Sequence, residues 1–246
     1  MTLRDCLNQY LQKISYRLVK LPKNRVRGLV LEHDLGIIFR DFKVTPVEAV
    51  LFDIGTNEGQ TLRRFAQIMP DAEIHGFEPT GELFEKLTHN YPSTTHPRIH
   101  LNRLALGDCI GKGVLHLASN SEENSLLATK TQEGSMLGEA TVEISTLDHY
   151  CAQHKVERID LLKIDAEGYD YKVLLGGAAI LDAKIVKLIL VECHFPARYE
   201  GEASFENIHH YLEDKGYQFV DFYDKVYKHN ALNSCNALFR IPEAAG

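Results

Sequence analysis

The 246-residue chain contains 44% hydrophobic and 25% charged residues, the balance of an ordinary globular protein. A formal net charge of −7 argues against a general nucleic-acid binder, because phosphate binding needs a concentrated positive field. The five cysteines are far apart and form no Cys-x-x-Cys pair or Cys/His ligand spacing. We therefore expect reduced thiols, no metal site and a cytoplasmic location.

Residues 1–30 form a basic segment in which Asp5 is the single acid. Apolar residues recur there at helical spacing, at Leu3, Leu7, Leu11, Ile14 and Leu18. This pattern predicts a basic amphipathic helical extension over residues 1–45 that docks on the domain with its basic side in water. A weak peripheral contact with an anionic membrane surface is the alternative.

Residues 46–246 are predicted to form one doubly wound α/β domain with a mostly parallel sheet, because short apolar runs alternate with amphipathic stretches. Central strands are expected at 50–54, 73–77, 99–106, 159–164 and 188–191. Helices are expected at 61–69 and 82–90, through Val173, Leu174 and Leu181, and from a cap at Ser204 to Gly216.

Three further segments complete the expected domain. A short strand at 113–118 should form an extra ribbon, and residues 119–140 read as a long polar loop. Strands at 217–222 and 237–241 are expected to form a hairpin-like return, which makes the last strand antiparallel.

The segment Asp53-Ile-Gly-Thr-Asn-Glu-Gly59 stands where a predicted strand turns into a predicted helix. Gly55 and Gly59 allow a tight turn and close approach of a ligand, and Asn57 is the non-glycine type that best tolerates positive φ. Ligands of open α/β sheets bind outside the carboxyl ends of the strands. We therefore expect this turn to form the floor of a ligand site, with helix N–H groups available to a carboxylate.

Glu78 follows the next predicted strand, where an acid can accept both hydroxyl hydrogens of an adenosine ribose. Dinucleotide enzymes use an acid at the same place, but their Gly-x-Gly-x-x-Gly turn would need glycine at 55, 57 and 60. This chain has Asn57 and Gln60 at two of those positions, which disfavours a nicotinamide dehydrogenase.

Ionisable residues also end the other predicted strands. Asp108 would place a hydrogen-bond acceptor near the adenine amino group, although a turn aspartate is the simpler interpretation. His194 is a candidate base by location and side-chain type, with Asp165 and Glu167 as alternatives. Lys163 shares a strand face with Asp165 and should pair with a nearby carboxylate, because an unpaired buried charge is costly.

The region from about residue 50 to 195 resembles the FkbM-type methyltransferases. The motifs that carry the resemblance are Asp53-Ile-Gly-Thr-Asn-Glu-Gly59, Phe77-Glu-Pro79, Ala105-Leu-Gly-Asp108, Asn124-Ser-Leu126, Thr146-Leu-Asp148, Ile159-Asp-Leu-Leu-Lys-Ile-Asp-Ala-Glu-Gly168 and Leu190-Val-Glu192. The resemblance implies a seven-stranded Rossmann-like methyltransferase fold, S-adenosylmethionine as cofactor, and usually O-methylation of a hydroxyl on a sugar or small natural product.

On matching positions the resemblance assigns cofactor contacts to the turn and the strand ends, and places Asp165 and Glu167 near the reacting centre. The implied cofactor contacts are Asp53, Gly55, Thr56, Asn57, Gly59, Glu78 and Asp108. Thr56 replaces the family's usual alanine, and Glu58 stands where an uncharged residue is commoner.

The segments outside this region match nothing diagnostic, so the acceptor, a small molecule or a glycan, is not specified. A non-catalytic cofactor- or glycan-binding module on the same fold is the alternative function. Retention of the whole turn from Asp53 to Gly59 argues against it.

Overall fold

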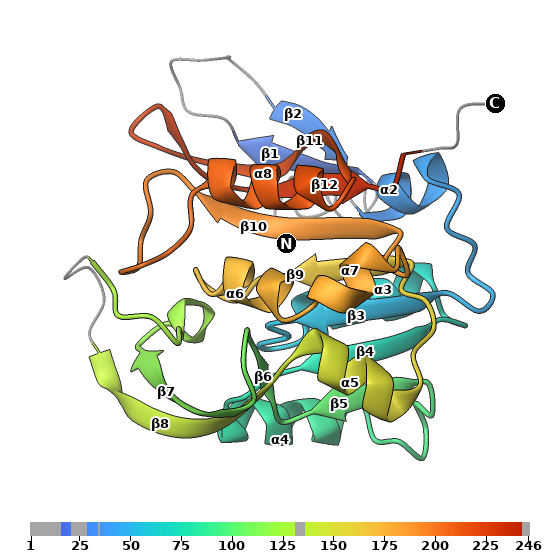
Figure 1. Ribbon diagram of the computed structural model, residues 1–246, viewed down its shortest axis with the longest axis horizontal. Helices are drawn as coiled ribbons and strands as arrows, with labels where there is room; N and C mark the ends of the chain where they lie inside the picture. The colour runs from blue at the N-terminus through green and yellow to red at the C-terminus, as the bar shows by residue number, and fades with distance from the viewer. Residues whose placement is uncertain (1–15, 21–28, 34, 131–135, 243–246) are drawn as a thin grey trace.

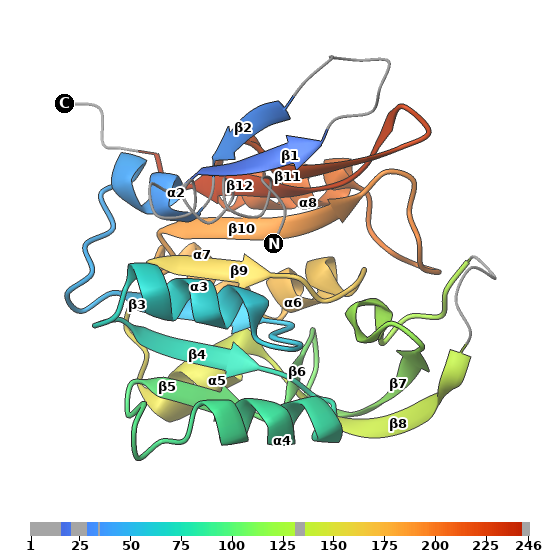
Figure 2. The same cartoon turned by 180° about the vertical axis from the view of Figure 1, so that it is seen from behind.

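The computed structural model describes residues 16–20, 29–33, 35–130 and 136–242 (Figures 1 and 2). Its centre is a seven-stranded sheet of order β11-β12-β10-β9-β3-β4-β5. The strands are β3 (Val50–Ile54), β4 (Glu73–Phe77), β5 (Ile99–Asn102), β9 (Leu161–Ile164), β10 (Leu188–His194), β11 (Gln218–Lys228) and β12 (Ala231–Arg240). Neighbouring strands from β10 to β5 are parallel, whereas β12 is antiparallel to both β10 and β11. The predicted doubly wound sheet with an antiparallel last strand is confirmed.

Helices cover both faces of this sheet (Figures 1 and 2). One face carries α2 (Leu35–Asp41), α3 (Gln60–Ile68) and α4 (Gly81–Asn90), and the other α5 (Leu147–His154), α6 (Asp170–Leu175), α7 (Ala178–Asp182) and α8 (Phe205–Asp214). Successive residues of the central strands serve the two cores in turn: Leu190 packs on the α2–α3 side and Val191 on the α5–α8 side. This two-sided burial explains the continuous apolar runs of the strands.

Helix α8 begins as the sequence predicts. The Ser204 hydroxyl accepts the N–H of Asn207, and the Asn207 side chain accepts the N–H of Ser204, which completes a capping box. Gly216, with φ of 73°, follows the helix and lets the chain turn into β11.

A second, three-stranded sheet of order β6-β8-β7 extends from the domain. It comprises β6 (Ala105–Leu106), β7 (Gly111–Ala118) and β8 (Met136–Ser145), so the expected ribbon at 113–118 is present. Two predictions need correction. The strand expected at 99–106 is divided between the two sheets, and the loop expected at 119–140 contains a 3-10 turn, η1 (Ser121–Glu123), and the start of β8. This sheet closes on its own small core of Leu115, Val142 and Ile144.

Within the predicted helical extension over residues 1–45, helix is present at α2, but the described residues before α2 are not helical. Two strands, β1 (Tyr16–Lys20) and β2 (Leu29–His33), pair antiparallel before α2. The helix predicted through Leu18 is therefore wrong at that residue. Val19 pairs with Val30 in the backbone register of this ribbon, and β-branched residues are common in strands. The other apolar positions of the predicted helix, Leu3, Leu7, Leu11 and Ile14, lie outside the described residues. No helix of the described chain is long and apolar enough to cross a bilayer.

Candidate active site

A cavity of about 490 Å³ lies where β3, β4, β9 and β10 reach their carboxyl ends. Chain order reverses on either side of β3, whose neighbours are β4 and β9, so the cavity lies at the topological switch point of the sheet. Residues from each of these strand ends line it, among them Gly55, Thr56, Asn57, Glu78, Lys163, Asp165, Glu167 and Glu192. Asp53, Gly59, Asp108 and His194 are absent from the lining.

The turn after β3 adopts the left-handed backbone that the sequence suggests. Its φ angles are 80° at Gly55, 49° at Asn57 and 84° at Gly59. A Cβ atom at Gly55 would lie 1.8 Å from the backbone oxygen of Asp165. Only glycine therefore lets the turn after β3 pass the turn after β9 at this distance.

Asp53 lies beneath this floor and is fully buried. Neither of its carboxylate oxygens has a hydrogen-bond partner among the described residues, and Lys163 Nζ is 3.9 Å from Oδ1. Burial raises the pKa of Asp53 to about 6, although the charge of Lys163 lowers it in part. Asp53 thus contributes negative charge beneath the cavity, but its side chain does not line the cavity.

Glu78 extends from the end of β4 into the cavity wall and is only 5% exposed. Its Oε2 accepts the Asn57 N–H at 2.9 Å and its Oε1 accepts the Thr80 N–H at 2.8 Å. Burial raises the pKa of Glu78, while these hydrogen bonds lower it. Each oxygen retains acceptor capacity, so the carboxylate is oriented to receive two hydroxyl hydrogens.

Asp108 stands apart from the other predicted cofactor residues. Its Oδ2 lies 2.6 Å from Lys172 Nζ, and its side chain forms no part of the cavity wall. The wall next to Glu78 consists instead of Leu104, Ala105 and Leu106.

Lys163, which is 8% exposed, and Asp165, which is 34% exposed, form an ion pair at the end of β9, as expected from their shared strand face. Lys163 Nζ lies 2.8 Å from Asp165 Oδ2. Burial alone would lower the pKa of Lys163, but Asp165 and Asp53 outweigh it and raise that pKa. Lys163 in turn lowers the pKa of Asp165 against the effect of burial. Asp165 is therefore an ionised carboxylate facing the cavity at neutral pH.

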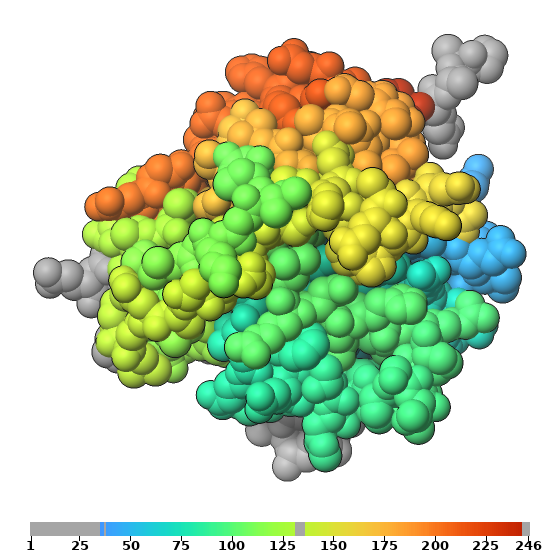
Figure 3. Space-filling model, turned by 60° about the horizontal axis from the view of Figure 1, so that its bottom comes forward, coloured from blue at the N-terminus to red at the C-terminus, as the bar shows by residue number. Residues whose placement is uncertain are grey.

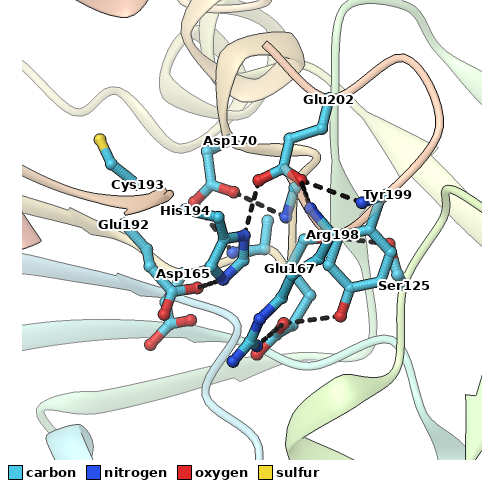
Figure 4. Close-up of polar contacts among 12 residues, drawn as sticks. Ser125, Asp165, Glu167, Asp170, Glu192, Cys193, His194, Arg198, Tyr199 and Glu202 are labelled. Atoms are coloured by element: carbon cyan, nitrogen blue, oxygen red, sulfur yellow. Dashed lines mark hydrogen bonds and ion pairs between the residues drawn. The ribbon is translucent and has the colours of Figure 1, made fainter. Parts of the chain in front are cut away.

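Glu167 has the opposite protonation state. Its backbone is left-handed, with φ of 48°, and its Oε2 accepts the Tyr199 hydroxyl at 2.7 Å, with Arg198 Nη1 at 3.6 Å (Figure 4). Burial, followed by repulsion from Glu192 and Asp165, raises the pKa of Glu167 to about 9. Glu167 is thus a neutral acid at physiological pH.

The turn that carries Asp165 and Glu167 is fixed from below by Asp170. One carboxylate oxygen of Asp170 accepts the N–H of Ala166 at 3.1 Å, and the other accepts that of Gly168 at 3.0 Å (Figure 4). The preorganised turn keeps both acids at the cavity wall.

His194 lies between two glutamates and is almost fully buried. Its Nδ1 is 2.6 Å from Glu202 Oε1 and its Nε2 is 3.3 Å from Glu192 Oε2 (Figure 4). Burial acts to lower the pKa of His194, but Glu192 and Glu202 raise it to about 10. An imidazolium outside the cavity wall cannot accept a proton, so this geometry argues against the base role predicted for His194.

The segment after β10 supplies residues that the sequence pattern did not single out. Glu202 Oε2 accepts the N–H groups of Arg198 at 2.6 Å and Tyr199 at 3.0 Å, and Tyr199 reaches Glu167. This segment matches no motif, and the Glu167 contact joins residues 32 positions apart. No local signal could have identified it. Asp224 and Asn236, from β11 and β12, also line the cavity.

Within the described ranges, three groups of side chains bring metal-ligand atoms close together. They are Glu73, His75 and His100; His209, His210 and Glu213; and Glu167, Glu192 and His194. In the last group His194 already interacts with Glu192 and Glu202, which balances its charge without an ion. The absence of a metal site stays a prediction.

The strand order, the glycine turn after β3 and the acid after β4 define a Rossmann-like methyltransferase. The family model of the methyltransferase FkbM domain matches residues 53–219, and the chain belongs to this family. It is an S-adenosylmethionine-dependent methyltransferase.

Two curated proteins and one solved structure illustrate the relationship. The chain is 28% identical over 167 residues to the 2-O-methyltransferase NoeI of Sinorhizobium fredii. This alignment covers 63% of this chain and 67% of NoeI. The chain is also 26% identical over 173 residues to the hexuronic acid methyltransferase AglP of Haloferax volcanii. That alignment covers 69% of this chain and 65% of AglP. The methyltransferase FkbM structure from Methylobacillus flagellatus KT aligns with a TM-score of 0.53 and 14% identity, over 96% of this chain and 50% of that one. This last likeness supports the fold alone.

Proposed function

We propose that the chain transfers the methyl group of S-adenosylmethionine to a hydroxyl of a sugar. The observation that carries this proposal is that one cavity joins Glu78 and the turn at 55–57 to the acids Asp165 and Glu167. The names of two relatives, a 2-O-methyltransferase and a hexuronic acid methyltransferase, support oxygen as the methylated atom and a sugar as the acceptor.

The residues present fit the cofactor. Glu78 holds two oriented carboxylate oxygens for the ribose hydroxyls, and the Leu104–Leu106 wall beside it offers an apolar surface to the adenine. The turn at Gly55 and Asn57 lines the same cavity and receives the amino-acid end. Asp53 and Gly59 shape this floor from below. When bound, S-adenosylmethionine supplies an electrophilic methyl group on a sulfonium.

Asp165 accepts the hydroxyl proton in this proposal. Of the three predicted catalytic residues, it alone both lines the cavity and is ionised at neutral pH. With S-adenosylmethionine bound, its sulfonium would supply the methyl group to the acceptor oxygen and leave as the neutral thioether, and Asp165 would take the hydroxyl proton. Lys163 orients the carboxylate, and neutral Glu167 donates a hydrogen bond that positions the acceptor.

The test is a turnover assay that measures S-adenosylhomocysteine formation with a panel of monosaccharides, uronic acids and sugar nucleotides. We expect wild-type turnover with at least one of them. Asp165→Asn should lower kcat by about 10²- to 10⁴-fold while cofactor affinity stays near the wild-type value. Asp221→Asn, at an exposed β11 position, is the matched control. Cofactor binding without turnover on any acceptor would favour the non-catalytic module instead.

A further inference from the structure

A second cavity of about 490 Å³ lies next to the cofactor cavity, between β7, the segment after β10 and the β11–β12 hairpin. Figure 3 shows the orange segment after β10 lying against the yellow-green β7–β8 region, and a backbone bridge from Thr129 to Tyr199 joins them. No step of the proposed reaction uses this cavity.

The wall between the two cavities is one chain thick. Along residues 122–127, Glu122, Asn124 and Leu126 line the cofactor cavity, whereas Glu123, Ser125 and Leu127 line the second cavity. Glu167 completes the partition, because its Oε2 receives the Tyr199 hydroxyl from the second cavity. A ligand in the second cavity is thus one residue away from the acids of the proposed active site.

The second cavity carries positive charge on an acidic protein. Arg198 and Lys228 line it, with Glu123 as the acid of the wall, although the chain has a net charge of −7. Arg198 Nη1 lies 3.6 Å from Glu167 Oε2, and the Arg198 side chain is 27% exposed. No carboxylate of the described chain lies within 4.0 Å of Lys228 Nζ.

Apolar and polar side chains complete this wall. Phe195 and Pro196 give the cavity an apolar side, and Ser125, Thr129 and Asn233 add polar groups, so a ring with hydroxyls and a negative charge matches its chemistry.

We propose that the second cavity is an acceptor subsite that takes an anionic group, a carboxylate or a phosphate, of the sugar compound that is methylated in the neighbouring cavity. This inference rests on the proposed function and specifies its substrate class. Arg198 and Lys228 bind the anion.

The experiment is calorimetry on the full chain saturated with S-adenosylhomocysteine. The probes are trigalacturonic acid against its neutral methyl ester, and galactose 1-phosphate against galactose. We expect at least one anionic probe to bind about tenfold more tightly than its neutral counterpart, with a smaller difference at high salt. The anion that binds more tightly identifies the group as a carboxylate or a phosphate.

Variants locate the subsite. Lys228→Gln should weaken binding of the preferred anion by about three- to tenfold and leave the neutral probe unchanged. Lys225→Gln, on the same hairpin but outside the cavity wall and close to Asp221, should bind like the wild type. Equal affinity for charged and neutral probes, or an anion preference that survives Lys228→Gln, would overturn the subsite. A chain that fails to bind S-adenosylhomocysteine in the first titration would overturn the proposed function instead.

Discussion

The His194 imidazole and the Glu202 carboxylate form an almost fully buried ion pair, 2.6 Å from Nδ1 to Oε1. The same carboxylate holds the backbone of Arg198 and Tyr199, so the pair connects β10 to the segment that reaches Glu167. Glu202 is therefore a positioning residue, which acts on the active site through its neighbours.

Glu202→Gln should destabilise the fold by about 1–3 kcal/mol, because it removes a charged acceptor from a buried imidazolium. Urea unfolding measures this loss. The exposed neighbour Glu200→Gln is the matched control and should stay within about 0.5 kcal/mol of the wild type. A similar small effect for both variants would show that the pair adds little to stability.

The same pair predicts how stability depends on pH. Folding raises the pKa of His194 from 6.5 to about 10, so the folded state holds its proton more tightly than the unfolded chain. The stabilisation is complete below pH 6.5 and is lost as the pH rises to about 10. In Glu202→Gln the decline of the unfolding free energy across this window should be shallower than in the wild type. Parallel curves for the two proteins would contradict the assignment.

Glu78→Ala should weaken S-adenosylhomocysteine binding by about 1.5–3 kcal/mol, the scale of hydrogen bonds to a charged group. Calorimetry measures the change, with Glu82→Ala on exposed α4 as the control. Glu78 also accepts the Asn57 and Thr80 N–H groups, so part of the loss in Glu78→Ala comes from a weaker turn. Glu78→Gln keeps one of the two acceptor oxygens and should lose less affinity. Unchanged affinity in both Glu78 variants would remove Glu78 from the cofactor site.

Gly55→Ala should destabilise the protein by about 3 kcal/mol or more, or prevent folding, because its Cβ would overlap the backbone of Asp165 at a positive φ. Gly111→Ala is the control, since a Cβ there meets no atom within 4 Å. Denaturant unfolding compares the two. A stable Gly55→Ala protein with normal cofactor affinity would mean that the two turns can separate freely.

Lys163→Met and Lys172→Met form a matched pair, because each lysine contacts an aspartate at similar distance. The Lys163–Asp165 separation is 2.8 Å with the lysine 8% exposed, and the Lys172–Asp108 separation is 2.6 Å with the lysine 44% exposed. Lys163→Met leaves Asp165 and Asp53 without their cation, so we expect a loss of about 3–5 kcal/mol. Lys172→Met should cost less than about 1 kcal/mol in the same urea titration. Similar losses of unfolding free energy in the two variants would show that burial of the lysine does not decide the cost of removing it.

The sequence predicted the central strands and the switch-point turn well, for a physical reason. Strands buried on both faces, such as β3 and β10, are apolar at nearly every position, and the glycines of the turn after β3 follow directly. β1 was missed because Leu18 continues the helical spacing of the apolar residues before it, and the start of β8 was missed because it lies in a stretch rich in polar residues. Helix α5 was also missed, since only Leu147, Tyr150 and Cys151 of its short span are buried.

The protonation states of the candidate site were beyond the sequence. His194 has the side chain of a base, yet its charge depends on Glu202, eight residues away in a segment without a motif. Glu167 and Asp165 are two positions apart and identical in chemistry, but Lys163 next to one and Glu192 near the other drive their pKa values in opposite directions. Such differences arise only when the chain is folded.

The alternation of side chains along residues 122–127 places a single stretch of backbone against both cavities. A substitution at 123, 125 or 127 reshapes the second cavity, and one at 122, 124 or 126 reshapes the cofactor cavity. Under the proposed division of roles, substitutions at 123 and 127 would alter acceptor binding, whereas a change at Ser125 would also reach the active site, because the Ser125 hydroxyl donates a hydrogen bond to the backbone oxygen of Glu167.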